Sequence, residues 1–296
     1  MNIIVMGAGA IGSLFGGLLS KNNNVTLIGR KPHIETIKKN GLTIKGKTKI
    51  NKKIPAETTV GKIKDSPDLI LLTVKSYDTE KAVKQVKKIM DKQTILLSLQ
   101  NGLGNIETIS RTINKNKVFA GVTTHGATFQ KPGVIKHTGK GYTKIGPIKE
   151  KNQKKAKEIV KLFNNAGIKT EISQNIIRQI WIKTIINSSI NPLTTFFQCK
   201  NGYILKNPIL ELIMEKICKE STTVVNKEGI KIANELTLEE TRQVIKDTAD
   251  NYSSMLQSVQ QGKKSEINSI NGKIVEIGKK FDVDVTLNDV LFRLIK

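Results

Sequence analysis

Short apolar segments alternate with amphipathic segments along the first 170 residues of the chain. The apolar segments each predict a strand, and they cover residues 3–6, 25–28, 69–74, 94–98 and 118–122. The segments between them show the apolar spacing of helices, and they cover residues 13–19, 32–41, 79–90 and 105–113. Uniformly apolar strands that alternate with helices are typical of a parallel sheet covered on both faces. The pattern therefore predicts an α/β fold for this part of the chain.

The pattern then changes twice. Between residues 130 and 146, polar and apolar residues alternate and glycines interrupt them, which predicts antiparallel strands appended to the sheet, before a helix at 154–165 and a short strand at 169–172. Long helical segments follow, at 175–189, 208–228, 238–259 and 266–280. We expect Pro192 to end the first of them, because proline disfavours helical geometry in the residue before it. The shift in composition predicts an α/β domain over 1–170 and an all-α domain over 171–296.

A glycine-rich turn follows the first predicted strand directly. Its six residues are Gly7, Ala8, Gly9, Ala10, Ile11 and Gly12. In such a turn the first glycine permits the tight bend, the second lets the backbone approach a pyrophosphate, and the third lets helix and strand pack closely. An ordinary glycine-rich turn is the alternative. A strand before the turn, a helix after it and a second strand within about 30 residues favour a dinucleotide-binding βαβ unit.

The residues after the second strand bear on the choice of dinucleotide. An acidic side chain at this place would bind the ribose hydroxyls of NAD, but the sequence has Gly29, Arg30 and Lys31. Fixed positive charge here favours the 2′-phosphate of NADP. A charged hydrogen bond is worth about 1.5–3 kcal/mol, which predicts a preference for NADPH with some use of NADH.

The helical half carries one polar stripe on an otherwise apolar segment. Lys183, Asn187 and Asn191 recur at every fourth residue within 174–191, which places them on one face of a helix. The stripe could be the solvent-exposed edge of a core helix. A lysine with two asparagines and no acidic neighbour instead suits an anionic, hydroxyl-bearing ligand, and partial burial would make the lysine a usable general acid.

Other polar residues lie at predicted strand and helix ends. Lys75 and Asn101 follow two of the strands, where open α/β sheets bind ligands, although a solvated lysine and a common turn dipeptide would look the same. Ser265 is expected to cap a helix that has Glu266 in its first turn, which the helix dipole alone explains.

The net charge of +24 comes from 49 basic and 25 acidic residues. Only five of the basic residues are arginines, the lysines are spread along the chain, and aromatic residues make up 4%, so the charge does not indicate a nucleic-acid partner.

Two cysteines without a CxxC pair and three scattered histidines predict no metal site. No apolar stretch is long enough for a membrane helix, and the first residues do not form a signal peptide. We expect a cytoplasmic protein.

Taken together, these motifs resemble the ketopantoate reductase (2-dehydropantoate 2-reductase) family over nearly the whole chain. The resemblance rests on GAGAIG at 7–12, Arg30, TVKSYDT at 73–79, QNGLGN at 100–105, TTHGA at 123–127, WIKTIINSSINPLT at 181–194, KNG at 200–202, NYSSMLQ at 251–257 and SEINSINGKIV at 265–275. It implies a Rossmann-like domain followed by a helical bundle similar to the C-terminal domain of 6-phosphogluconate dehydrogenase. It also implies reduction of 2-dehydropantoate to (R)-pantoate with NADPH, in pantothenate and coenzyme A biosynthesis.

The resemblance assigns roles to individual residues. Lys183 would donate the proton to the ketone oxygen while the dinucleotide supplies the hydride. The substrate would be bound by Asn101, Asn187, Asn191, Asn201, Asn251 and Ser254. The cofactor would be bound by residues 7–12, Arg30, Lys75, Asn101, Ala127 and Glu266.

Two other functions stay open. One is another NADP-dependent dehydrogenase of 2-keto or hydroxy acids with the same two-domain plan. The other is a non-catalytic sensor that binds NADP(H). The oligomeric state is also open, with a homodimer as one option.

Overall fold

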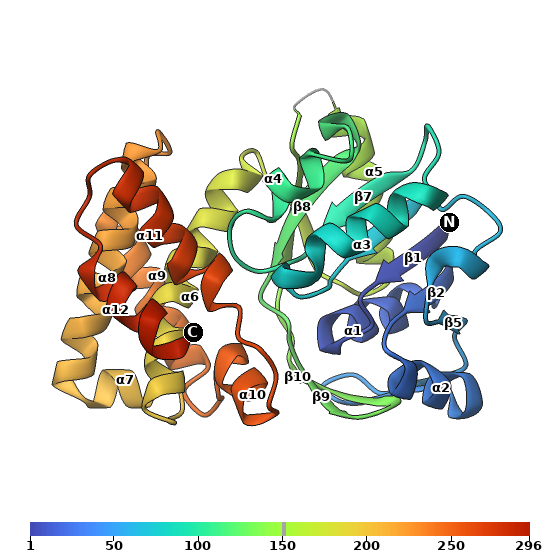
Figure 1. The fold of residues 1–296 in the computed structure, drawn as a ribbon. Helices are drawn as coiled ribbons and strands as arrows, with labels where there is room; N and C mark the ends of the chain where they lie inside the picture. The colour runs from blue at the N-terminus through green and yellow to red at the C-terminus, as the bar shows by residue number, and fades with distance from the viewer. Residues whose placement is uncertain (150–151) are drawn as a thin grey trace. The chain divides into compact units, whose positions relative to one another are not determined.

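The computed structural model describes residues 1–149 and 152–296, and its contacts divide the chain into two units. The first unit comprises residues 1–100 and 105–176, and the second comprises residues 101–104 and 177–296. The first is an α/β unit and the second is helical (Figure 1). This confirms the predicted fold class. No helix within the described ranges is both long enough and apolar enough to cross a membrane.

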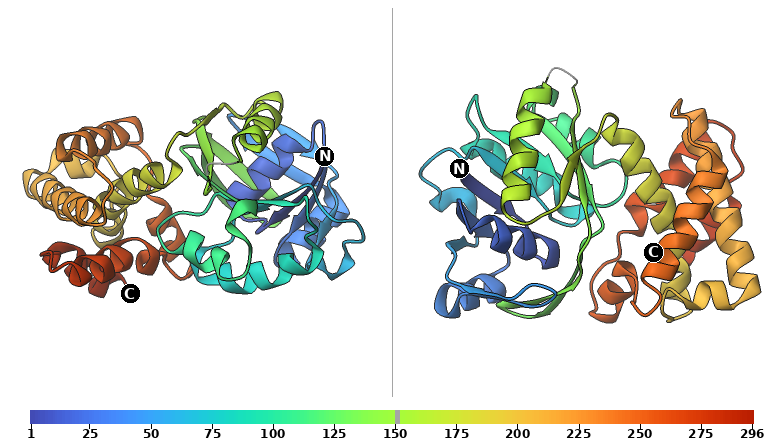
Figure 2. Two further views of the ribbon diagram at one scale, coloured as in Figure 1. Left: turned by 90° about the horizontal axis from the view of Figure 1, so that it is seen from above. Right: turned by 180° about the vertical axis from the view of Figure 1, so that it is seen from behind.

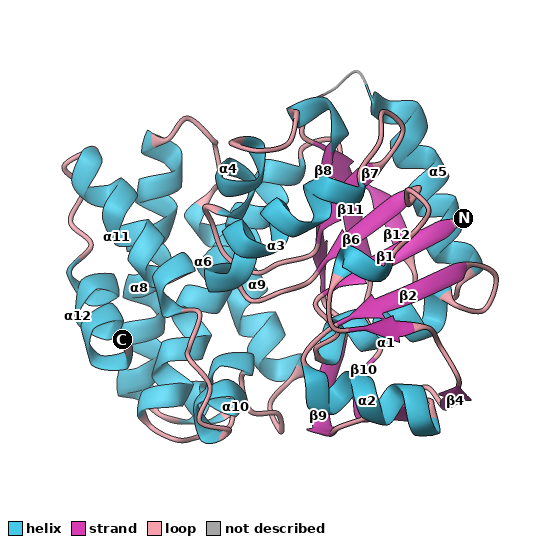
Figure 3. Cartoon of the chain, turned by 45° about the vertical axis from the view of Figure 1, so that its right-hand side comes forward, coloured by secondary structure: helices cyan, strands magenta, loops and turns pink. Residues whose placement is uncertain are grey.

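Eight strands of the described α/β unit form its main sheet, drawn in magenta in Figure 3. In spatial order they are β12 (Thr170–Ile172), β11 (Thr143–Pro147), β8 (Val118–Thr123), β7 (Ile95–Ser98), β6 (Leu69–Leu72), β1 (Asn2–Met6), β2 (Asn24–Ile28) and β5 (Ala56–Glu57). Neighbouring strands are parallel except β11, which runs antiparallel to β8. The sheet order reverses beside β1, and this is where open α/β sheets bind their ligands.

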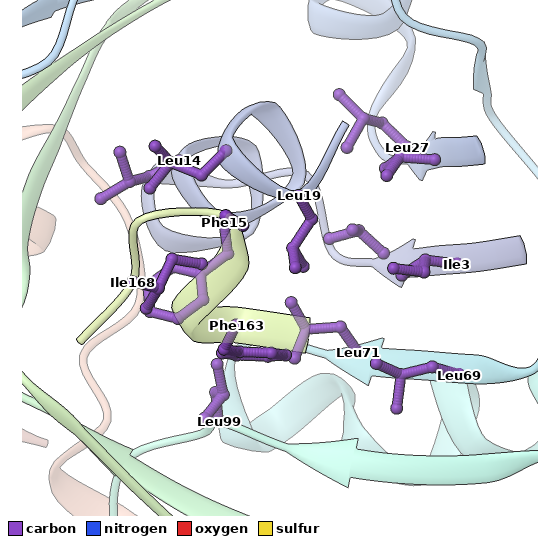
Figure 4. Close-up of a cluster of buried hydrophobic side chains, with 14 of the residues drawn as sticks. Ile3, Leu14, Phe15, Leu19, Leu27, Leu69, Leu71, Leu99, Phe163 and Ile168 are labelled. Atoms are coloured by element: carbon purple, nitrogen blue, oxygen red, sulfur yellow. The ribbon is translucent and has the colours of Figure 1, made fainter. Parts of the chain in front are cut away.

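Both faces of the main sheet are buried, which explains the uniformly apolar strands. The helices of this unit are α1 (Ala10–Leu19), α2 (Lys31–Asn40), α3 (Thr79–Val86), α4 (Asn105–Ser110) and α5 (Gln153–Asn165). Side chains of β1 alternate between the two faces: Ile3 packs in one core with α1 and α5 (Figure 4), whereas Ile4 packs in another with α3 and α4. Single-turn 3-10 helices lie at Val60–Lys62, Ser76–Asp78, Lys87–Ile89 and Lys115–Lys117.

A second, four-stranded sheet corrects the prediction for residues 130–146. Its order is β4 (Ile50–Lys52), β3 (Leu42–Gly46), β10 (Val134–Gly139) and β9 (Gly126–Lys131). Only β11 extends the main sheet as predicted, whereas β9 pairs with β10, and β10 pairs with β3, a strand that the sequence did not predict. This sheet packs against α1, where Gly17 leaves room for the buried side chains of Leu42 and Ile44.

The second unit consists mainly of helices (Figure 2), which bury one large apolar cluster and one small one. They are α6 (Ile176–Phe196), α7 (Tyr203–Lys206), α8 (Pro208–Lys227), α9 (Asn234–Asp247), α10 (Ser254–Gln260), α11 (Asn271–Lys280) and α12 (Thr286–Ile295). A 3-10 turn, Ile267–Ser269, precedes α11. The sequence did not predict α7 and α12.

Several helix boundaries in this unit differ from the prediction, and hydrogen bonds explain two of the differences. Helix α6 runs through Pro192 to Phe196 rather than ending at the proline. Proline has no N–H to donate to the carbonyl oxygen of Ser188, and the buried side chain of Asn271 donates to that oxygen instead, at 3.1 Å. The replacement hydrogen bond satisfies the carbonyl group that the proline leaves open, so the helix can continue.

The expected helix at 238–259 is two helices, α9 and α10. The carbonyl oxygens of Ala249 and Asn251 accept hydrogen bonds from the backbone N–H groups of Gly202 and Asn201, each at 3.0 Å. The chain between the helices is thereby held by a distant turn. Helix α10 begins after Ser253, whose hydroxyl caps it by accepting from the Leu256 N–H.

Candidate functional site

The glycine-rich turn forms a tight cradle between β1 and α1. Gly7 has a φ of +113°, and its N–H and that of Ala8 both donate to the carbonyl oxygen of Ile28 on β2. The Thr73 hydroxyl donates to the Gly7 carbonyl oxygen at 2.8 Å. A Cβ atom at Gly12 would collide with that same oxygen and with the Thr73 hydroxyl. The first and third glycines are therefore required by the local geometry.

The start of α1 can receive an anion. Gly9 precedes the helix, no side chain caps it, and its first turn contains no acidic residue. The first N–H groups of a helix have no partner within the helix, and the helix dipole favours negative charge beside them. The cradle, the uncapped helix and the neighbouring β2 thus fit the pyrophosphate of a dinucleotide.

Arg30 and Lys31 lie at the start of α2, directly after β2. The Arg30 side chain is 75% exposed, and its Nη2 lies 3.7 Å from Oδ2 of Asp78. Lys31 pairs with Glu35, one turn further along α2, also at 3.7 Å. Asp78 was not predicted as a site residue, although it belongs to the TVKSYDT motif at 73–79.

Side chains that were not predicted as site residues join the loops after β6 and β7 by hydrogen bonds. The Gln100 side-chain amide donates to the Val74 carbonyl oxygen at 3.0 Å and to the Thr79 hydroxyl at 2.7 Å. Thr79 in turn donates to Asn105. Lys75 is partly buried between these anchored residues, at the start of the Ser76–Asp78 turn. This network fixes the backbone on either side of Lys75.

Ala127 lies on β9 and pairs with His137 on β10. His137 Nε2 donates to the Gly139 carbonyl oxygen at 2.9 Å and lies 3.3 Å from Nδ1 of the buried His125. Burial, and to a lesser degree the neighbouring His137, lower the pKa of His125 to about 4. The histidine of the TTHGA motif is therefore neutral and packed into the core of the α/β unit.

Helix α6 carries the catalytic candidate of the helical unit. Lys183 and Asn187 are partly buried and Asn191 is buried, so the stripe is not a solvent-exposed edge. Burial lowers the pKa of Lys183 from 10.5 to about 8, while the Glu266 carboxylate acts in the opposite direction. Glu266 is itself only 8% exposed. A lysine with this pKa can hold a proton near neutral pH and release it to a developing oxyanion.

Glu266 and Asn101 belong to the same unit, and the segments that carry them are in contact. Asn101–Gly104 packs with the helical unit, where the Leu103 N–H donates to the Ser269 carbonyl oxygen at 2.7 Å. The N–H and hydroxyl of Ser269 both donate to the Glu266 carbonyl oxygen. Ser265 accepts from the Ile267 N–H, but the residue that precedes the 3-10 turn is Glu266, so Ser265 does not cap a helix beginning at 266 as predicted.

The remaining substrate candidates lie around the start of α10. Asn201 is 6% exposed, and its Nδ2 donates to Thr248, while its Oδ1 is buried without a hydrogen-bond partner. The backbone N–H of Asn201 donates to the carbonyl oxygen of Asn251, whose side chain is exposed. Ser254 is also exposed, and the residue before it, Ser253, accepts a hydrogen bond from Thr194 on α6.

The fold and the glycine cradle define a two-domain oxidoreductase with a Rossmann-like domain and a helical domain. Two family models match the chain: "Ketopantoate reductase PanE/ApbA" over residues 3–150 and "Ketopantoate reductase PanE/ApbA C terminal" over residues 175–296. The chain therefore belongs to the ketopantoate reductase family, as the motifs indicated.

Named relatives agree with this assignment. A 2-dehydropantoate 2-reductase of Pyrococcus horikoshii is 42% identical over 297 residues, which cover 100% of this chain and 97% of that protein. The structure of a PanE/ApbA family ketopantoate reductase from Ralstonia eutropha is 30% identical, with a TM-score of 0.92 and coverage of 100% and 97%. A ternary structure of D-mandelate dehydrogenase with NADH and anilino(oxo)acetate is 27% identical, with a TM-score of 0.95 and the same coverage.

Proposed function

We propose that this chain reduces 2-dehydropantoate to (R)-pantoate with NADPH as the preferred reductant. The observation that carries the proposal is the environment of Lys183: partly buried on the polar stripe of α6, with its pKa lowered to about 8 and with the buried Glu266 acting on its charge. Family membership supplies the substrate, since relatives named 2-dehydropantoate 2-reductase match the chain over its full length.

The α/β unit would hold the dinucleotide. Residues 7–12 would receive its pyrophosphate at the start of α1, and Arg30 would pair with a 2′-phosphate. Lys75, Ala127, Asn101 and Glu266 would bind the remainder. The bound dinucleotide would supply the hydride to the keto carbon of the substrate.

The helical unit would bind the keto acid and complete the reaction. When the keto carbon gains the hydride, negative charge develops on the ketone oxygen, and Lys183 would stabilise it and transfer a proton from Nζ to that oxygen. Asn187, Asn191 and Asn201, with Asn101, Asn251 and Ser254, would bind the carboxylate and hydroxyl groups. The buried Oδ1 of Asn201 supports this role, because a hydroxyl donor from a ligand would satisfy it.

A second candidate is the oxidoreduction of other 2-hydroxy acids, which the likeness to D-mandelate dehydrogenase favours. The two functions differ in the substrate side chain: a hydroxylated branched alkyl group in one case and an aromatic ring in the other. Comparing kcat/KM for 2-dehydropantoate with that for benzoylformate, the keto acid of mandelate, discriminates between them. A higher value for benzoylformate would overturn the proposed substrate.

The proposed chemistry is tested by Lys183→Ala, assayed by NADPH oxidation. We expect kcat to fall about 100-fold or more, which is the usual contribution of general acid catalysis. Lys219→Ala, which removes an exposed lysine on α8 of the same unit, is the matched control and should keep full activity. A wild-type chain that binds NADPH but turns over no keto acid would be the sensor rather than the reductase.

We also propose the cytoplasm as its location, which suits the two free cysteines, and a small-molecule substrate rather than a nucleic acid or a membrane as its partner.

A further inference from the structure

Asp78 contributes a carboxylate to the place where the sequence alone predicted only positive charge. It ends the Ser76–Asp78 turn that follows β6, and Arg30 follows β2. The pair joins Arg30 Nη2 and Asp78 Oδ2 at 3.7 Å, with side chains that are 75% and 44% exposed. Two loops that are distant in sequence therefore meet through opposite charges.

The order of the strands shows what this pair spans. β1 lies between β2 and β6, and its last residue, Met6, is level with Ile28 on one side and Leu72 on the other. The loops that carry Arg30 and Asp78 therefore leave the sheet on opposite sides of the glycine-rich turn. Their ion pair crosses the carboxyl end of β1, where the adenosine part of a dinucleotide held by that turn must lie.

We infer that Asp78 is a specificity-determining residue that limits the preference of this chain for NADPH over NADH. The inference rests on the proposed function. A 2′-phosphate must compete with the Asp78 carboxylate for Arg30, and the nearby negative charge repels the phosphate. The same carboxylate can accept hydrogen bonds from the ribose hydroxyls of NADH, which in other Rossmann folds is the role of an acidic residue at the end of the second strand.

Lys31 does not compensate for the effect of Asp78 on the preference for NADPH. Its ammonium pairs with Glu35 on the same helix at 3.7 Å, so both cations after β2 have carboxylate partners. Arg30 and Lys31 alone predict a preference for NADPH, and the two carboxylates offset part of the positive charge on which that preference depends. The chain therefore uses both dinucleotides, with a moderate advantage for NADPH.

The direct test is Asp78→Asn, which keeps the size of the side chain and removes its charge. Dissociation constants for NADPH and NADH, from titrations of nucleotide fluorescence, and kcat/KM for both should be compared with wild type. We expect the NADPH-to-NADH ratio of affinities to rise about twofold to fivefold, the range expected for a charge interaction at a largely exposed site. Part of the rise should come from weaker binding of NADH.

Two further variants make the result specific. Glu80→Gln removes the same charge two residues away, on α3, from a side chain that pairs with Lys84 rather than with Arg30, and it should leave the ratio unchanged. Asp78→Glu keeps the carboxylate and should keep a ratio close to that of wild type. Thermal denaturation of each variant separates loss of folding from a change in preference, because unfolding would weaken both dinucleotides alike.

The outcomes separate this inference from the proposed function. If Asp78→Asn binds both dinucleotides with an unchanged ratio, or shifts the ratio towards NADH, the role of Asp78 is refuted and the reductase proposal stands. An equal rise in Glu80→Gln would also refute it, since the effect would then be one of net charge. If wild-type protein binds neither dinucleotide, the proposed function fails and this inference fails with it.

Discussion

The proton held by Lys183 should set the alkaline limit of the reaction, and Glu266 should set where that limit falls. Burial lowers the pKa of Lys183 from 10.5 to about 8 against the opposing influence of Glu266. At about 1.4 kcal/mol for each tenfold change in the protonation equilibrium, the net effect of burial and Glu266 disfavours the ammonium form by about 3.5 kcal/mol. Replacing Glu266 by glutamine removes the carboxylate that partly compensates, so the pKa of Lys183 must fall further.

The sign of the effect on the rate follows directly. With a pKa of about 8, roughly nine-tenths of the lysine is protonated at pH 7 and roughly one-tenth at pH 9. Reduction needs the protonated form, so kcat should fall about tenfold for each pH unit above 8. In Glu266→Gln the same decline should begin at lower pH. The variant should then lose kcat near neutral pH and recover it in acid.

The assay is NADPH oxidation at saturating keto acid and saturating NADPH across a pH series, so that any weaker cofactor binding does not enter kcat. Glu276→Gln is the matched control, because Glu276 is an exposed carboxylate on α11 that pairs with Lys273. Its pH profile should coincide with that of wild type. A profile in Glu266→Gln that keeps the wild-type alkaline limit, or a wild-type rate that does not decline above pH 8, would refute the reasoning.

Three further predictions concern the two units separately. Gly12→Ala would press a methyl group against the Gly7 carbonyl oxygen, so NADPH affinity should fall about tenfold or more; an unchanged titration would contradict the cradle geometry. Asn271→Leu would leave the Ser188 carbonyl oxygen without its donor, and urea denaturation should show a free energy of unfolding lower by about 1–3 kcal/mol; equal stability would show that the hydrogen bond contributes nothing. Because the pKa of His125 is about 4 in the fold against 6.5 ordinarily, the unfolded chain binds more protons between these values, and stability should fall as pH drops below 6.5. At pH 5 the loss should reach about 2 kcal/mol relative to a His125→Gln variant, whose stability should change less with pH.

The sequence predicted the main sheet well because burial on both faces leaves a continuous apolar run in each strand. In the second sheet, β3 and β4 escaped prediction because they are partly exposed and carry no continuous apolar run, and β3 pairs with β10, about 90 residues away. The predicted end of helix α6 at Pro192 was too early because the rule that proline ends a helix considers only neighbouring residues. The donor that allows the helix to continue, Asn271, comes from a segment almost 80 residues later.

For the candidate site, periodicity revealed the stripe on α6, and the structure shows the burial that gives it chemical meaning. Glu266 was indistinguishable from an ordinary first-turn carboxylate, because its influence on Lys183 depends on packing between α6 and the segment before α11. Asp78 was overlooked for a similar reason: its partner Arg30 lies 48 residues earlier and comes near only through the order of the strands. The network around Gln100 likewise has no local sequence signal.

The short segment Asn101–Gly104 has a consequence for how the protein can be dissected. Although it lies between residues of the α/β unit, its Leu103 is part of the apolar core of the helical unit. A truncated chain starting at residue 177 would lack this leucine and would leave a hole in its own interior. The helical half is therefore not an independent domain in sequence. We expect a fragment that starts at residue 177 to be unstable unless a peptide containing residues 101–104 is added.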